Sequence, residues 1–170
     1  MAQYIYLTGE NLNVISKTLG PAMKNRDPGP IREMAERETK AGVDFIDLNI
    51  GPARKGGAEL MEWIVKTVQE VTDLPLFLDT SNVEAIEAGL KVYRPKKGKA
   101  IINSIMARPE RMKALIPLAG KYGAGMVALL WGPEGMPRDT DERAMFLAEL
   151  YMAGTEAGVA PEDIFVDPII

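Results

Sequence analysis

The chain has 170 residues, of which 46% are hydrophobic and 26% charged, with a formal net charge of −4. This size and composition are typical of one globular domain with its own core, and no apolar run reaches the roughly 20 residues that cross a bilayer. Cysteine and histidine are both absent. Disulfides, zinc–thiolate sites, cysteine nucleophiles and histidine acid–base catalysis are therefore excluded, and any chemistry must use carboxylates, amides, hydroxyls, lysines or a borrowed cofactor.

The charge and the N-terminal stretch bear on location and partners. A net negative charge argues against a nucleic-acid partner, which usually requires a basic face. The opening "MAQYIYLTGE" has neither a basic segment nor a long apolar segment, so it does not resemble a secretory signal. We therefore expect a cytoplasmic protein with no membrane or nucleic-acid partner.

Short apolar runs recur along the chain and predict strands. Each run is nearly continuous, as expected for strands that are covered on both faces. The six predicted strands cover residues 4–8, 43–48, 76–79, 100–103, 126–130 and 164–167.

Helical periodicity separates these strands. Met61, Ile64, Val65 and Val68 form a complete i, i+3, i+4, i+7 stripe. Four further helices are predicted from stripes at Ile31–Glu38, Val83–Leu90, Met112–Ala119 and Ala144–Tyr151. The first of these stripes has apolar residues at only three of its four positions, because Glu38 occupies the last.

Residues with strong end preferences mark several helix ends. Asn82 is a predicted N-cap, and Pro109 falls in a first turn. Gly42 and Gly158 are predicted to follow helix C-termini.

Strict alternation of strands and helices implies a parallel sheet with right-handed crossovers. A doubly wound open sheet and a (β/α)8 barrel both fit this order. The open dinucleotide-binding form needs a G-x-G-x-x-G turn after the first strand, where this chain has "GENLN". The interpretation is therefore a (β/α)8 barrel with about six of its βα units in the chain.

Polar residues end the predicted strands, and the corresponding ends of a barrel build its active site. Asp79, Asn103 and Asp167 each close an apolar run, where an unpaired polar group is costly, and they are the preferred ligand-binding set. Further candidates at strand ends are Asn11, Asn49 and Ser104.

Ordinary structural roles compete with these assignments. Residues of these types also cap helices and favour turns without any ligand. This is the preferred interpretation of Asn82, and for Asp47 hydrogen bonding within the barrel is as good an explanation as ligand binding. Arg54 and Lys55, before a predicted helix N-terminus, could hold an anion such as an acidic tail, although an ordinary loop explains them better.

Carboxylates and amides without histidine or cysteine suit a neutral heterocycle rich in N–H donors. An ionised aspartate can accept two parallel N–H bonds from an amino-pyrimidinone edge, and an amide both donates and accepts. A pterin offers that pattern, whereas a sugar phosphate would be repelled by the aspartates.

The sequence resembles the pterin-binding methyltransferase family, and within it the methyltetrahydrofolate:corrinoid/iron–sulfur protein methyltransferases. The matching segments run in order along the chain: "GENLN", "DFIDLNIGPA", "MEWIVKTVQEVTDLPLFLDTSNVEAIEAGLK", "INS", "GMPRDTDER" and "EDIFVDPII". The resemblance implies a (β/α)8 barrel whose pterin site uses Asp79, Asn103 and Asp167.

The resemblance also implies an activity. Members of the family move the N5-methyl group of methyltetrahydrofolate to Co(I) of a corrinoid on a partner protein, and they form homodimers. The cobalt then supplies the nucleophile, so the protein has to orient the folate and stabilise the changing charge at N5. No metal site is predicted on the chain itself.

Several alternatives remain open. They are methyl transfer in the reverse direction in a corrinoid-dependent demethylase system, dihydropteroate synthase, and a pterin-binding fragment without activity. The chain has "VISKTLG" after "NLN" instead of the stretch usual in dihydropteroate synthases.

In the family, an asparagine near the seventh strand contacts N5, and the sequence given ends before it, at Ile170. The catalytic contact is therefore expected beyond Ile170. We expect a barrel domain truncated after strand six, roughly 90 to 100 further residues in the natural protein, and no activity from these 170 residues alone.

Overall fold

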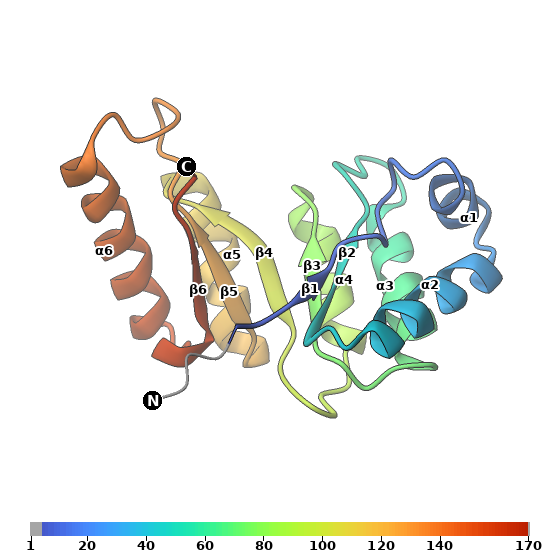
Figure 1. The fold of residues 1–170 in the computed structure, drawn as a ribbon. Coiled ribbons are helices and arrows are strands. Elements are labelled where there is room, and N and C mark those ends of the chain that lie inside the picture. Colours follow the sequence, from blue (N-terminus) through green and yellow to red (C-terminus); the bar gives the residue numbers. More distant parts are fainter. Residues whose placement is uncertain (1–4, 170) are drawn as a thin grey trace. The chain divides into compact units, whose positions relative to one another are not determined.

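The computed structural model describes residues 5–169 (Figure 1). All six predicted strands and all five predicted helices are present, and strands alternate with helices as expected. The structure adds the short helix α1 and a 3-10 turn, η1, that the sequence patterns did not predict. The chain divides into two compact units, residues 1–100 and 101–170, which are described separately below.

Unit 1 contains three parallel strands in the order β1-β2-β3. Figure 1 shows α1, α2 and α3 along one side of these strands. Its elements are β1 (Thr8–Gly9), α1 (Leu19–Asn25), α2 (Pro28–Ala41), β2 (Phe45–Asn49), α3 (Gly57–Gln69), β3 (Leu76–Asp79) and α4 (Val83–Val92).

The helices of unit 1 follow their predicted stripes. Met61, Ile64, Val65 and Val68 on α3 are fully buried, so the period-3.6 pattern identified the core face of this helix. Gly89 brings α4 close to α3, since a Cβ at this position would lie 2.7 Å from Met61 Cγ. The predicted caps are also confirmed: the Asn82 side chain accepts from the Ala85 N–H, and Gly42 ends α2 in the left-handed conformation.

Strand β1 is much shorter than the predicted run. The prediction covered residues 4–8, of which residue 4 lies outside the described part of the chain, and the observed strand is Thr8–Gly9. The backbone of Leu7 bonds instead to the segment before β2, because its N–H donates to the Asp44 carboxylate and its carbonyl accepts from the N–H groups of Asp44 and Phe45. Ile5 and Tyr6 remain mostly exposed.

Unit 2 contains three parallel strands in the order β4-β5-β6. Its elements are β4 (Ile101–Met106), α5 (Pro109–Tyr122), β5 (Gly125–Leu129), α6 (Thr140–Glu156), η1 (Pro161–Asp163) and β6 (Ile164–Asp167). Pro109 begins α5 as predicted, and Gly158 follows α6 with a positive φ of 91°. Ile170, beyond which the N5-contacting asparagine is expected, lies outside the described residues.

Helix α6 is rotated relative to the prediction. The expected stripe was Ala144, Leu147, Ala148 and Tyr151, but the buried residues are Phe146, Leu150 and Gly154. Glycines decide this orientation: Gly132 leaves room for the Phe146 ring, and Gly154 lies against Met126 and Ile164. The opposite face of α6 exposes Met145, Tyr151 and Met152.

Among residues 5–169, no helix has both the length and the apolar character needed to cross a membrane.

The contact between α5 and α6 depends on a glycine. A Cβ at Gly120 would lie 2.1 Å from the backbone carbonyl oxygen of Ala157, and backbone cannot move aside as a flexible side chain can. We therefore expect Gly120→Ala to destabilise the protein by about 1–3 kcal/mol, although alanine normally favours a helix interior. Urea denaturation measures the change. Gly29→Ala in α2, where a Cβ meets only Asp27 at 3.3 Å, is the control, and an equal effect of the two variants would contradict the packing argument.

Candidate functional site

Asp79 and Asn49 lie side by side at the carboxyl ends of two neighbouring strands. The two residues are in register between β2 and β3. The Asn49 side-chain amide donates to Asp79 Oδ2, while its Oδ1 accepts from the Gly51 N–H at 2.9 Å. Because the amide is held at both ends, its NH2 group faces the aspartate. The structure thus brings Asp79, from the preferred ligand-binding set, together with Asn49, one of the further candidates.

The environment of Asp79 disfavours its charge. Burial raises the pKa of the Asp79 carboxyl from 3.8 to about 6, the hydrogen bond from Asn49 acts in the opposite direction, and the negative charge of Glu10 raises the pKa again. Asp79 closes a run of three buried residues, Leu76 to Leu78, as the sequence suggested. Asp79 is therefore mainly ionised at pH 7 and becomes protonated as the pH falls through about 6.

The turn after β3 supports the neighbouring loop. Thr80 donates its hydroxyl to the Gly51 carbonyl at 2.5 Å, and the Asn82 amide donates to the Ala53 carbonyl at 2.9 Å. Since Asn82 also caps α4, one residue joins the helix start to the loop after β2. This fixes the backbone on both sides of the Asn49–Asp79 pair and explains Asn82 without any ligand. Asp47, buried in the middle of β2, also has a polar or electrostatic partner.

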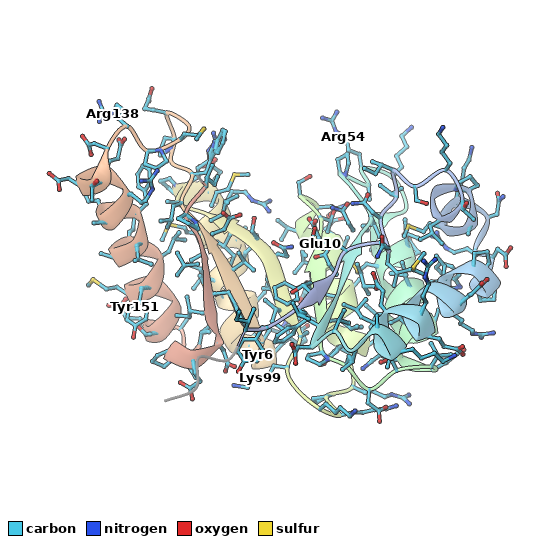
Figure 2. All side chains as sticks on the ribbon, viewed as in Figure 1. Tyr6, Glu10, Arg54, Lys99, Arg138 and Tyr151 are labelled. Atoms are coloured by element: carbon cyan, nitrogen blue, oxygen red, sulfur yellow. The ribbon has the colours of Figure 1, made fainter. Side chains whose placement is uncertain are left out.

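The segment after β1 joins the same strand ends. Asn13 forms an isolated parallel bridge with Asn49, in which the Val14 N–H donates to the Asn49 carbonyl and the Asn49 N–H donates to the Leu12 carbonyl. Two residues earlier, Asn11 is exposed and hydrogen-bonds to Glu38 on α2. Glu10, labelled in Figure 2, precedes it directly. The "GENLN" segment is therefore anchored at both ends.

A cavity of about 520 Å³ lies beside the loop after β2. Its apolar wall includes Val14, Met23, Ile50 and Leu60, and its cationic groups are Lys24, Arg26 and Lys55. Helix α3 begins next to it without a side-chain cap, after Gly56 in the left-handed conformation. Arg54 extends from the same loop (Figure 2). Positive groups beside an uncapped helix N-terminus favour an anion, whereas Glu59 in the first turn of α3 acts against one.

Asn103 and Ser104 belong to unit 2 and lie inside β4, which continues to Met106. The prediction that the strand ends at residue 103 is therefore wrong. The pairing of β4 with β5 shifts register between Ile102 and Ile105, so the two polar residues form an irregularity of the β-bulge kind. A bulge changes the direction of side chains within a strand, which explains how polar residues are accommodated between buried isoleucines. The Asn103–Ser104 peptide bond is cis.

Asp167 ends β6 as predicted, but the expectation of a buried run before it is wrong. Ile164 and Phe165 are half-buried, and Val166 and Asp167 are exposed. The reason is that β6 pairs with a single strand of its unit, β5, so its other edge and part of its surface stay uncovered in the described structure. Asp167 Oδ1 accepts from the Ile169 N–H at 3.0 Å, and the Asp167 carbonyl accepts from Leu130.

Glu38 on α2 is a buried polar residue beside β1 for which the sequence pattern predicted no role. Its side chain is only 4% exposed, although it carries a carboxylate. The signal was present in the sequence, because Glu38 occupies the i+7 position of an otherwise apolar stripe. Within residues 5–169, no group of three or more acidic side chains is arranged to hold a metal ion.

Residues 9–170 match the family described as pterin binding enzyme, and the chain belongs to this family. A curated relative named methylcorrinoid:tetrahydrofolate methyltransferase, from Eubacterium limosum, is 25% identical over 166 residues. This alignment covers 96% of the chain and 60% of the relative, so the chain spans about three fifths of the relative's length.

Solved structures with the same fold include dihydropteroate synthases. The enzyme of Xanthomonas albilineans, in complex with indole-2-carboxylic acid and 6-chloroguanine, matches with a TM-score of 0.67 at 19% identity, and that of Thermus thermophilus with 0.66 at 22%. The matches cover 97% and 98% of the chain, and 59% and 60% of those proteins. The predicted barrel class is thus confirmed, with six βα units of that fold in the chain.

Two neighbours of Asp79 act on its pKa in opposite directions. Replacing Asn49 by leucine keeps the site buried and removes the hydrogen bond, so the pKa of Asp79 should rise above about 6. Glu10→Gln removes a nearby negative charge and should lower this pKa. Carbon-13 NMR titration of the Asp79 carboxyl measures both shifts. Shifts of the same sign in the two variants would show that another group controls the titration.

Proposed function

We propose that this chain carries the pterin-binding part of a methyltransferase that moves a methyl group between N5 of tetrahydrofolate and the cobalt of a corrinoid on a partner protein. The observation that carries the proposal is the Asn49–Asp79 pair, an oriented and half-buried carboxylate at the strand ends of a pterin-binding enzyme. The relative from Eubacterium limosum supports the choice of reaction through its name.

Asp79 is suited to hold the pterin. One of its oxygens is occupied by the Asn49 amide, and the carboxylate keeps lone pairs for N–H donors of an amino-pyrimidinone edge. The fixed direction of the carboxylate orients the ring and so reduces the entropy cost of positioning the methyl group. We assign further pterin contacts to Asn103 and Asp167 in unit 2, with Ser104 as a weaker candidate.

The remaining groups of unit 1 suit the rest of a folate. The cavity beside the loop after β2 combines an apolar wall with Lys24, Arg26 and Lys55. An apolar ring that carries an acidic tail fits such a lining, because the ring packs on the wall while the carboxylates meet the cations.

The bound corrinoid supplies the methyl-carrying metal, so the protein itself needs no nucleophile. This agrees with a chain that has neither cysteine nor histidine. In this proposal the residues of unit 1 bind and orient the folate, and none of them is assigned to the contact with N5. The relative's name gives the direction from methylcorrinoid to tetrahydrofolate, and the proposal covers transfer in both directions.

Dihydropteroate synthase is the second candidate. The solved dihydropteroate synthases share the fold. This chain, however, has "VISKTLG" at residues 14–20, where the sequence pattern usual for those enzymes is absent. A synthase assay with a pterin diphosphate and 4-aminobenzoate distinguishes the two activities directly.

Asp79→Ala should weaken the binding of methyltetrahydrofolate by about 10- to 100-fold, because it removes a charged hydrogen-bond acceptor for the pterin. Isothermal titration calorimetry measures the dissociation constant. The part of the affinity that depends on Asp79 should fall as the pH drops through about 6, since the carboxyl then protonates.

Asp73→Ala is the matched control, because Asp73 is a surface carboxylate paired with Lys96 and should not affect binding. Asp167→Ala tests the assignment in unit 2 separately. If Asp79→Ala and Asp167→Ala both left the affinity intact, the assignment of the pterin site would be wrong.

The full-length protein should convert Co(I) cobalamin and methyltetrahydrofolate to methylcobalamin, or run the reverse reaction, and residues 1–170 alone should not. The change in the cobalamin absorption spectrum reports both directions. Folate binding without any methyl exchange by the full-length protein would favour a pterin-binding module. Formation of dihydropteroate instead would favour the synthase.

A further inference from the structure

Glu38 places a carboxylate inside unit 1, close to β1. Its Oε1 accepts from the backbone N–H and from the side-chain Nδ2 of Asn11, both at 2.9 Å. Its Oε2 is buried without a hydrogen-bond partner among the described residues. A half-satisfied buried carboxylate is costly, and an apolar residue would complete the α2 stripe at lower cost. Packing alone therefore does not explain this residue.

Strand β1 makes room for this carboxylate. A Cβ at Gly9 would lie 2.6 Å from Glu38 Cδ and 2.8 Å from each of its carboxylate oxygens. The strand can pass the carboxylate only because residue 9 has no side chain. The position of the Glu38 head group is therefore set from two sides, by Gly9 and by Asn11.

The chemistry of a carboxylate fixes the orientation of the Asn11 amide. The Asn11 Nδ2 donates to Glu38 Oε1, so the NH2 group of Asn11 faces Glu38. The Asn11 Oδ1 is then turned away, and no hydrogen bond to it is found in the described structure. Asn11 is exposed at the end of β1, two residues before the Asn13–Asn49 bridge.

We propose that Glu38 is a positioning residue: it orients the Asn11 amide so that Asn11 presents its carbonyl oxygen as an acceptor to an N–H group of the bound pterin. This inference rests on the proposed function and extends it. It makes Asn11 an acceptor and not a donor, two residues before the Asn13–Asn49 bridge.

Two substitutions at residue 38 separate orientation from charge. Glu38→Gln keeps a carbonyl oxygen for both hydrogen bonds from Asn11, so affinity for methyltetrahydrofolate should stay within about twofold. Glu38→Met keeps the length of the side chain and removes the acceptor, and affinity should fall about 5- to 10-fold. Equal losses in the two variants would mean that the charge of Glu38, and not its acceptor, matters.

A double-mutant cycle tests whether Glu38 acts through Asn11. Asn11→Ala should weaken methyltetrahydrofolate binding about 5- to 10-fold in the natural background. In the Glu38→Met background, Asn11→Ala should weaken methyltetrahydrofolate binding by at most a further factor of about two, because the Asn11 amide has already lost its orientation. Fully additive losses would overturn the proposal, and so would an Asn11→Ala variant with natural affinity.

Gly9→Ala provides an independent variant that changes neither polar residue. The added methyl group should displace the Glu38 carboxylate and reproduce the loss seen in Glu38→Met. If thermal melts show that Glu38→Met does not unfold cooperatively, Gly9→Ala replaces it in the double-mutant cycle with Asn11→Ala. A Gly9→Ala protein with unchanged affinity and unchanged coupling to Asn11 would contradict the role of Glu38.

Asp79→Ala, measured in the same titrations, separates a failure of the Glu38 role from a failure of the proposed function. If Asp79→Ala weakens methyltetrahydrofolate binding while the variants at residues 9, 11 and 38 do not, the proposed role of Glu38 is wrong and the proposed function stands. If none of these variants affects methyltetrahydrofolate binding, the proposed function falls as well.

Discussion

The hydrogen bond from the Asn49 amide to the Asp79 carboxylate is the constraint around which the strand ends of unit 1 are organised. It links β2 to β3, and the other end of the same amide holds the Gly51 N–H. The backbone of Asn49 in turn holds the segment after β1. Asn49 therefore links the ends of three strands through hydrogen bonds. Its hydrogen bond to Asp79 partly offsets the cost of burying that carboxylate.

Much of the fold could be predicted from the sequence, because local periodicity and burial agree where an element has one apolar face. The stripe on α3 is the clearest case, and Asn82 was identified as a cap from its type and position. Helix α6 shows the limit: apolar residues surround most of it, so periodicity could not select a face. The selection depends on Gly132 and Gly154, which are distant in sequence from the residues they accommodate.

The candidate site shows a similar division. The end of a buried run correctly indicated a desolvated Asp79, because burial beside strand residues is a local property. The partner of Asp79 required the register between β2 and β3, which no local pattern contains. The exposure of Asp167 and the bulge at Asn103–Ser104 also depend on neighbouring strands. The sequence showed Glu38 as the one polar position of an otherwise apolar stripe. Its hydrogen bonds to Asn11, which suggest a role for it, could be found only in the structure.

The raised pKa of Asp79 has a thermodynamic consequence for ligand recognition. A free carboxyl that titrates near 6 is partly protonated in mildly acidic solution, whereas a carboxylate that accepts N–H bonds from a ligand must be ionised. Under the proposed function, association in that range releases a proton from the protein to the solution. The heat observed on binding would then include the ionisation enthalpy of the buffer, and the apparent affinity would be linked to the proton concentration.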